Sequence, residues 1–239
     1  DQLAIAKPLC KAAFRVLHAQ DIGIGIARAI RSALSGRPGG VYLDLPAKLF
    51  AQTMDAAAGK ASLIKVVDPA PKQIPAPDAV ERALALLKGA KKPLILLGKG
   101  AAYAQADADI RALVEKTGIP FLTTQLGKGV IDEAHPLFLG CAALSAGDFV
   151  HRAIGAADLI VNIGHDVIEK PPFFMQVGGT EVIHISTRSA EVDPVYFPQI
   201  EVIGDIANAF WQMKEDIVPS PSWNFDPMLR ARKAEVEHT

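Results

Sequence analysis

Glycines and polar residues follow five apolar runs of the sequence, and binding chemistry is expected at these positions. Two of the segments also carry a lysine, GKGA at 98–101 and LGKG at 126–129. Glycine lets a ligand approach the backbone closely, and free amides at the start of a helix bind anions. A lysine adds direct charge to a phosphate. The predicted ligand-binding residues are therefore Gly98, Lys99, Gly100, Ala101, Gly127, Lys128, Gly164, His165, Ser186, Thr187, Arg188 and Asp205.

The segment GKGAAY at 98–103 matches neither standard phosphate-binding motif. It lacks the third glycine of GxGxxG and the GK[ST] ending of a P-loop. Two interpretations stay open. Several loops together form a nucleotide site, or the glycines serve only the geometry of strand-to-helix turns.

Motifs for catalysis or metal binding are absent from the sequence. The histidines show neither HExxH nor paired metal-ligand spacing, Cys10 and Cys141 form no CxxC pair, and there is no GxSxG segment. His184 lies inside an apolar run and is expected to be a hydrogen-bonded core residue, whereas His165 follows a strand. We predict no catalytic residue and no metal ligand in this chain.

The composition excludes several classes of protein. The chain has 239 residues, of which 50% are hydrophobic and 21% charged, as in ordinary globular proteins. A net charge of −1 gives no basic field for nucleic acid or an anionic membrane surface. No apolar run approaches the roughly 18 residues of a membrane span. Together with the two isolated cysteines, these features favour a cytoplasmic protein.

Helical and strand patterns alternate after residue 77, and they define the main domain. Continuous apolar strands separated by helices indicate a parallel sheet covered on both faces. The predicted fold is α/β, a doubly wound parallel sheet of Rossmann-like type over residues 78–216, with ligands expected at the carboxyl ends of its strands. The expected strands are 92–98, 119–124, 158–164, 181–186 and 200–204, and the expected helices are 78–88, capped by Asp78, 105–117, 145–157, a short turn at 189–193, and 205–215, capped by Asp205.

The first part of the chain reads as an incomplete domain. Residues 21–46 predict a helix capped by Asp21 and then a strand, and these two elements cannot bury their own apolar faces. The proline-containing segment 47–77 predicts an extended linker. Because the sequence opens inside an amphipathic pattern and ends in a charged helical stretch, we expect a fragment of a longer polypeptide.

Several long segments resemble a known enzyme family. DIGIGIARAI at 21–30, GRPGGVYLDLPAKLF at 36–50 and the stretch 92–122 are similar to the oxalyl-CoA decarboxylase family, and this similarity runs over most of residues 5–122. Residues 123–210 are more similar to the large subunit of acetolactate synthase-type enzymes. On both counts the chain is identified as a member of the thiamine-diphosphate-dependent decarboxylase and carboligase superfamily.

The resemblance implies a domain order and a cofactor. Residues 1–46 would end the pyrimidine-binding domain, 47–77 would be a linker, 78–216 the central Rossmann-like domain, and 217–239 the start of a linker to the diphosphate-binding domain. Thiamine diphosphate and Mg²⁺ would be held by parts of the parent enzyme outside this chain, which is therefore expected to be inactive alone. The resemblance also implies a homodimer or homotetramer.

A second ligand is implied for the central domain. Oxalyl-CoA decarboxylases bind ADP there, and biosynthetic acetolactate synthases bind FAD. By position, Arg37 and Lys99 match residues that contact ADP. The family's aspartate for the ribose is replaced by Ser186, whose hydroxyl cannot offer a diol the charged two-point acceptor of a carboxylate. ADP, FAD and no ligand all stay open.

Four functions follow from these observations. The leading hypothesis is a thiamine-diphosphate-dependent lyase that converts oxalyl-CoA to formyl-CoA and CO₂. The first alternative is condensation of pyruvate to acetolactate, so the substrate is an acyl-CoA or a 2-oxo acid. The second is a non-catalytic nucleotide-binding or subunit-packing module. An independent dinucleotide-dependent oxidoreductase is disfavoured by the incomplete GxGxxG motif.

Overall fold

The computed structural model describes residues 1–142, 148–164, 174–192 and 194–236. The chain divides into two compact units, Asp1–Lys72 and Gln73–Thr239. This division falls inside the segment 47–77 that the sequence predicts to be a linker. Within the described part of the chain, no helix is long and apolar enough to cross a membrane.

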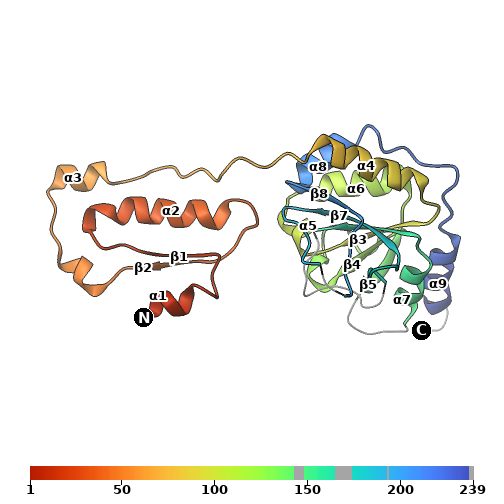
Figure 1. Cartoon of the computed structure of the whole chain (residues 1–239), viewed down its shortest axis with the longest axis horizontal. Helices are drawn as coiled ribbons and strands as arrows, with labels where there is room; N and C mark the ends of the chain where they lie inside the picture. Colours follow the sequence, from red (N-terminus) through yellow and green to blue (C-terminus); the bar gives the residue numbers. More distant parts are fainter. Residues whose placement is uncertain (143–147, 165–173, 193, 237–239) are drawn as a thin grey trace. The chain divides into compact units, whose positions relative to one another are not determined.

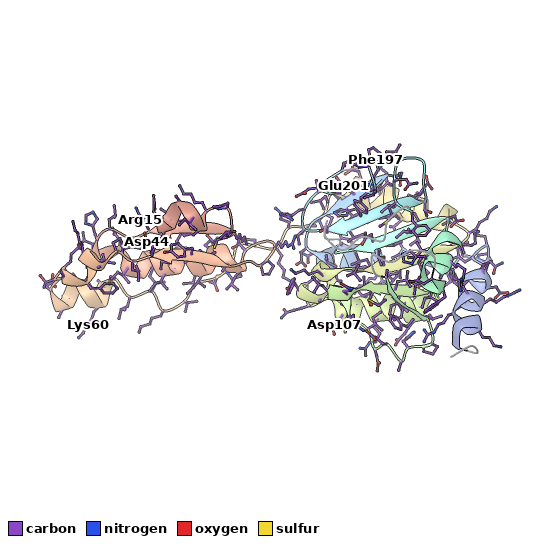
Figure 2. All side chains as sticks on the ribbon, turned by 90° about the horizontal axis from the view of Figure 1, so that it is seen from below. Arg15, Asp44, Lys60, Asp107, Phe197 and Glu201 are labelled. Carbon is purple, nitrogen blue, oxygen red and sulfur yellow. The ribbon has the colours of Figure 1, made fainter. Side chains whose placement is uncertain are left out.

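The first unit contains a parallel pair of short strands connected by a helix (Figure 1). The Arg15 guanidinium reaches the Asp44 carboxylate, with 2.5 Å between Nε and Oδ2, and this pair joins the ends of the two strands (Figure 2). The elements are, in chain order, α1 (Gln2–Ala6), β1 (Ala12–Arg15), η1 (Ala19–Asp21), α2 (Ile22–Leu34), β2 (Val41–Asp44), η2 (Ala47–Ala51) and α3 (Ala56–Ala61).

Helix α2 leaves an apolar stripe uncovered within the first unit. Ile26, Ile30 and Leu34 follow one another at four-residue spacing, so they lie on one side of the helix, and they are 43%, 41% and 53% exposed. Asp21 occupies the N-cap position of this helix, as predicted, but its side chain makes no capping hydrogen bond. The 3₁₀ turn η1 leads directly into α2, so Asp21 already has helical backbone angles.

A six-stranded parallel sheet forms the centre of the second unit, in the order β5-β4-β3-β6-β7-β8. The chain moves outward from β3 to β5, returns past β3 to β6, and then moves outward again to β8. This path is the doubly wound topology, with its switch point between β3 and β6, and it confirms the predicted fold. The strands are β3 (Pro93–Leu97), β4 (Phe121–Thr124), β5 (Phe138–Ala142), β6 (Leu159–Ile163), β7 (Glu181–Ser186) and β8 (Ile200–Ile203).

Two apolar layers cover the sheet. Alternate residues of each strand point to opposite faces, so Ile95 and Ile183 enter one layer and Leu94 and Val182 the other. On the first face the layer is completed by α4 (Pro77–Gly89), α6 (Asp107–Thr117) and α8 (Ile206–Met213) (Figure 1). On the second face it is completed by α7 (Phe149–Gly155) and α9 (Asp226–Val236).

Several elements differ from their predicted form. Ala76, not Asp78, is the N-cap of α4, because Pro77 occupies the first helical position and Asp78 falls in the first turn. The helix expected over 105–117 begins at Asp107 and is preceded by α5 (Lys99–Tyr103). Residues 189–192 are not helical. Strands β1 and β5 had not been predicted.

The end of the linker is attached to α8. The Asp205 carboxylate caps this helix by accepting from the amide of Asn208 at 3.1 Å, as predicted from the sequence. The amide of Asp205 donates to the carbonyl of Gln73 at 2.9 Å, and the Gln212 side chain donates to the carbonyl of Pro75 at 3.4 Å. A Cβ on Gly204 would lie 2.7 Å from the Pro75 ring, so glycine is needed there for the linker to pass.

Candidate functional site

The carboxyl edge of the sheet gathers most of the residues that the sequence predicts to bind a ligand. All strands of the sheet are parallel, so their carboxyl ends share this edge. Arg37 belongs to the first unit, and His165 lies outside the described residues. The others follow or end the strands: Gly98, Lys99, Gly100 and Ala101 after β3, Gly127 and Lys128 after β4, Gly164 after β6, Ser186, Thr187 and Arg188 at β7, and Asp205 after β8.

Glycines at three strand ends continue the hydrogen bonding of the sheet. The amide of Gly98 donates to the carbonyl of Ile163 at 2.8 Å, and the amide of Gly164 donates to the carbonyl of Ile185 at 2.8 Å. On the next strand, the amide of Gly204 donates to Ser186 at 2.9 Å. These amides therefore already have carbonyl partners within the protein.

The switch point between β3 and β6 is closed by direct backbone contact. The amide of Gly100 donates to the carbonyl of Gly164 at 2.8 Å. A Cβ on Gly100 would lie 2.7 Å from the Cα of Gly164, and a Cβ on Gly164 would lie 2.1 Å from the amide nitrogen of Ala101. Gly164 also has a φ of +69°, which favours glycine. The glycines of this turn thus allow two strand ends to touch.

Cationic side chains at this edge have different surroundings. The ammonium of Lys99 lies 5.7 Å from the ring centre of Tyr103, in the same short helix. Lys128 forms an ion pair with Glu133, with 3.3 Å between Nζ and Oε1. Arg188 is exposed on the loop after β7, whereas Ser186 at the end of that strand is buried. Lys99 and Arg188 are therefore the two cations best placed to meet an anion from solvent.

Two side chains hold the backbone of the loop after β7. The ring nitrogen Nε2 of His184 lies 2.9 Å from the carbonyl oxygen of Arg188, and the Glu201 carboxylate accepts from the amide of Ala190 at 2.6 Å. The structure thus places His184 in the hydrogen-bonded core, as the sequence predicted. Glu201 was missed, although a lone acidic residue in the apolar run IEVI signals a specific partner.

The described ranges contain no cluster of three or more His, Cys, Asp or Glu side chains close enough together to hold a metal ion. Cys10 and Cys141 are both free thiols.

Comparison with known proteins places this sheet in a family. Residues 80–213 match the thiamine pyrophosphate enzyme central domain. The chain belongs to the thiamine pyrophosphate enzyme family. This thiamine pyrophosphate family member is 40% identical to the oxalyl-CoA decarboxylase of Escherichia coli (strain K12) over 223 residues, which cover 91% of the chain and 38% of the relative. The chain thus spans less than half the length of this relative.

The chain is also similar to enzymes of the family that have other activities in their names. It is 32% identical to a 2-hydroxyacyl-CoA lyase of Oryza sativa subsp. japonica, over 92% of the chain and 39% of the relative. It is 26% identical to an acetolactate synthase of Bacillus subtilis (strain 168), over 91% of the chain and 38% of the relative. A solved structure from Mycobacterium smegmatis, described as a thiamin diphosphate-dependent enzyme, matches with a TM-score of 0.73 at 23% identity, over 92% of this chain and 42% of that one. At that identity the match supports the fold.

The described residues do not suit the family cofactor. Thiamine diphosphate is bound together with a divalent cation, which takes oxygen ligands such as carboxylates. Among the residues described here, no set of three candidate metal ligands comes together.

Proposed function

We propose that this chain is part of a thiamine-diphosphate-dependent lyase acting on a CoA thioester, with oxalyl-CoA as the first substrate to test. The observation that carries the proposal is the 40% identity to oxalyl-CoA decarboxylase over 91% of the chain, against 26% to acetolactate synthase. The 32% identity to 2-hydroxyacyl-CoA lyase supports the same substrate class. Pyruvate condensation is the runner-up.

The proposal assigns the chemistry to other parts of a longer enzyme. Thiamine diphosphate, when bound, supplies a carbanion that adds to a carbonyl and accepts the electrons released as CO₂ leaves. We place that cofactor and Mg²⁺ outside this chain, which spans 38% of the decarboxylase and gathers no metal-binding cluster among its described residues. Ile26, Ile30 and Leu34 form an exposed apolar stripe on α2. This stripe supports the proposal that another protein surface packs against the first unit. We also propose that the full-length enzyme is a cytoplasmic homo-oligomer.

A decarboxylation assay tests the proposal. We expect the full-length protein, supplied with thiamine diphosphate and Mg²⁺, to release CO₂ and form formyl-CoA from oxalyl-CoA, and to leave pyruvate unchanged. The 239-residue chain alone serves as the control and should release none. Acetolactate formed from pyruvate, with oxalyl-CoA untouched, would instead support the runner-up. Turnover by the chain alone would refute the assignment of the cofactor to other parts.

For the central domain we propose a nucleotide, ADP or FAD, at the carboxyl edge of the sheet. The support is positional, since the switch point of a doubly wound sheet is its usual ligand site. Lys99 and Arg188 would meet the phosphates, because their side chains are not in ion pairs with any residue that the structure describes. Lys128, Ser186 and Thr187 stay predicted contacts.

Loss of either cation should weaken nucleotide binding. A hydrogen bond to a charged group contributes about 1.5 to 3 kcal/mol, so Lys99→Ala and Arg188→Ala should each raise the dissociation constant by about tenfold or more. Isothermal titration with ADP and with FAD measures this. Lys88→Ala is the matched control. Lys88 lies near the end of α4, just before the amino end of β3, and therefore away from the carboxyl edge of the sheet. Unchanged affinity in both variants would rule out this placement of the phosphates.

A second candidate, a packing module that binds no nucleotide, is favoured by one observation. The amides of Gly98, Gly100, Ala101 and Gly164 all donate to carbonyls of the protein, so the turn offers few amides to an anion. Titrations with ADP, FAD, CoA and NAD that show no heat and no change in melting temperature would support this candidate.

A further inference from the structure

Three polar residues lie side by side across the apolar sheet. Asn162 on β6 is opposite His184 on β7, and His184 is opposite Glu201 on β8. Asn162 is fully buried and His184 is 2% exposed. Buried polar groups are costly unless they are hydrogen-bonded, so this row requires specific partners.

The partners of His184 fix which ring nitrogen carries the proton. Its Nε2 lies 2.9 Å from the carbonyl oxygen of Arg188, and a carbonyl can only accept, so Nε2 must donate. Burial lowers the pKa of His184, more than the nearby Glu201 carboxylate and the Arg188 carbonyl raise it, so the ring is neutral near pH 7. In a neutral ring Nδ1 then has no hydrogen and accepts a bond.

The Tyr196 hydroxyl supplies that bond. Its oxygen lies 2.9 Å from His184 Nδ1, so the hydroxyl donates to the ring. The Asn162 side-chain amide in turn donates to the Tyr196 oxygen at 3.3 Å. Burial also raises the pKa of Tyr196, so the phenol keeps its proton. The bonds therefore run in one direction, from Asn162 to Tyr196 to His184 to the backbone of the loop.

The loop that receives these bonds carries the exposed cation of the candidate site. His184 holds the loop at the carbonyl of Arg188, and Glu201 holds it at the amide of Ala190. Figure 2 marks Glu201 together with Phe197 near the start of β8. With its backbone held from the sheet, the Arg188 side chain is presented to solvent.

We propose that His184 is a positioning residue that latches the loop after β7 for nucleotide binding, and that protonation of His184 releases the latch. The inference rests on the proposed nucleotide site. A second proton must go to Nδ1, where it faces the Tyr196 hydroxyl and displaces its hydrogen. It also creates an imidazolium in the apolar layer. When the loop opens, the ring is exposed to water. The conflict with the Tyr196 hydroxyl and the burial of the imidazolium then no longer oppose protonation.

The sign of the pH effect follows from linkage. In the closed loop the pKa of His184 lies below its usual value of 6.5, whereas in the open loop the ring returns toward that value. Between the two values the open form binds more protons, so closure is complete above about pH 6.5 and is lost as the pH falls. One proton changes the equilibrium by at most about tenfold per pH unit. The charged or titratable groups around the ring, among those described, are Glu201, Arg188 and Tyr196.

The first test needs no nucleotide. Nitrogen-15 NMR of the histidine side chains in the 239-residue chain should show His184 as the neutral Nε2–H tautomer at pH 7.5. The amide of Ala190 should lose protection from hydrogen exchange, corrected for the intrinsic rate, as the pH falls from 7.5 to 5.5. An Nδ1–H tautomer, or protection that does not change with pH, would refute the latch.

The second test measures ADP affinity between pH 7.5 and 5.5. Wild-type affinity should fall by up to about tenfold, beyond any change in His184→Gln, whose amide can still donate to the Arg188 carbonyl but gains no proton. ADP itself gains a proton in this range, so the difference between variants is the readout. His18→Gln, at an exposed histidine, should behave as wild type. Equal pH slopes in wild type and His184→Gln would overturn the proposal.

The two tests separate failure of the latch from failure of the site. Absence of ADP binding in every variant at every pH, together with the expected tautomer and exchange, would refute the nucleotide site and leave the latch intact. ADP binding together with an Nδ1–H tautomer of His184 would refute the latch and leave the nucleotide site intact.

Discussion

Gly164→Ala should destabilise the second unit by about 2 to 5 kcal/mol. Two costs add: a non-glycine residue in the left-handed region loses about 1 to 2 kcal/mol, and overpacking typically costs about 1 to 3 kcal/mol. The overpacking is severe because the new Cβ would lie 2.1 Å from the amide nitrogen of Ala101, which is backbone and cannot rotate away. Urea unfolding followed by tryptophan fluorescence measures the loss, since Trp211 and Trp223, the two tryptophans of the chain, both belong to the second unit.

Gly118→Ala is the matched control for this substitution. Gly118 ends α6 with the same φ of +69°, but no atom lies within 4 Å of where its Cβ would be. Its cost should therefore be the backbone strain alone, about 1 to 2 kcal/mol. If the two variants lose equal stability, then the contact between the ends of β3 and β6 is not the constraint described above.

Asp158→Ala should cost the second unit about 2 to 3 kcal/mol. The Asp158 carboxylate accepts from the amide of Lys91 at 2.9 Å and from the amide of Lys92 at 2.8 Å, just before β3 begins. Hydrogen bonds to a charged acceptor contribute about 1.5 to 3 kcal/mol each, and two that share one carboxylate do not add fully. Because Asp158 precedes β6, this pair of bonds joins the amino ends of the two central strands.

Asp158→Asn separates the effect of the two hydrogen bonds from the effect of removing the side chain. The amide retains one acceptor oxygen and presents a donor to the second backbone amide, so its cost should lie between those of wild type and Asp158→Ala. Asp216→Ala, at an exposed aspartate, should change the free energy of unfolding by less than about 0.5 kcal/mol. If Asp158→Ala leaves the free energy of unfolding unchanged, water satisfies the backbone amides of Lys91 and Lys92 as well as the carboxylate does.

The sheet could be predicted where its strands are long and apolar. PLILL and LIVNI are buried on both faces, and their lack of alternation indicates a parallel sheet. Strand β1, AAFR, has four residues and weak strand propensity. Strand β5 contains Gly140 at a φ of +130°, next to a register shift against β4. Local sequence does not specify such strands, because pairing with a neighbour stabilises them.

The candidate site could be placed on an edge, but its hydrogen bonds could not be predicted. Parallel topology alone brings Gly98, Gly164 and Ser186 to the carboxyl ends. Whether the glycine amides are available to an anion depends on the register between β3, β6 and β7, which a single sequence does not give. The same holds for His184, whose burial was evident from EVIHIS while its bond to the Arg188 carbonyl depends on the path of the loop.

The attachment of the linker to α8 has a mechanical consequence. Gln73 and Pro75 are hydrogen-bonded to Asp205 and Gln212, so residues 73–76 move with the second unit although they have no regular secondary structure. We therefore expect tension applied along the linker to be borne first by these hydrogen bonds to Asp205 and Gln212. The strands of the sheet are spared until those bonds have failed.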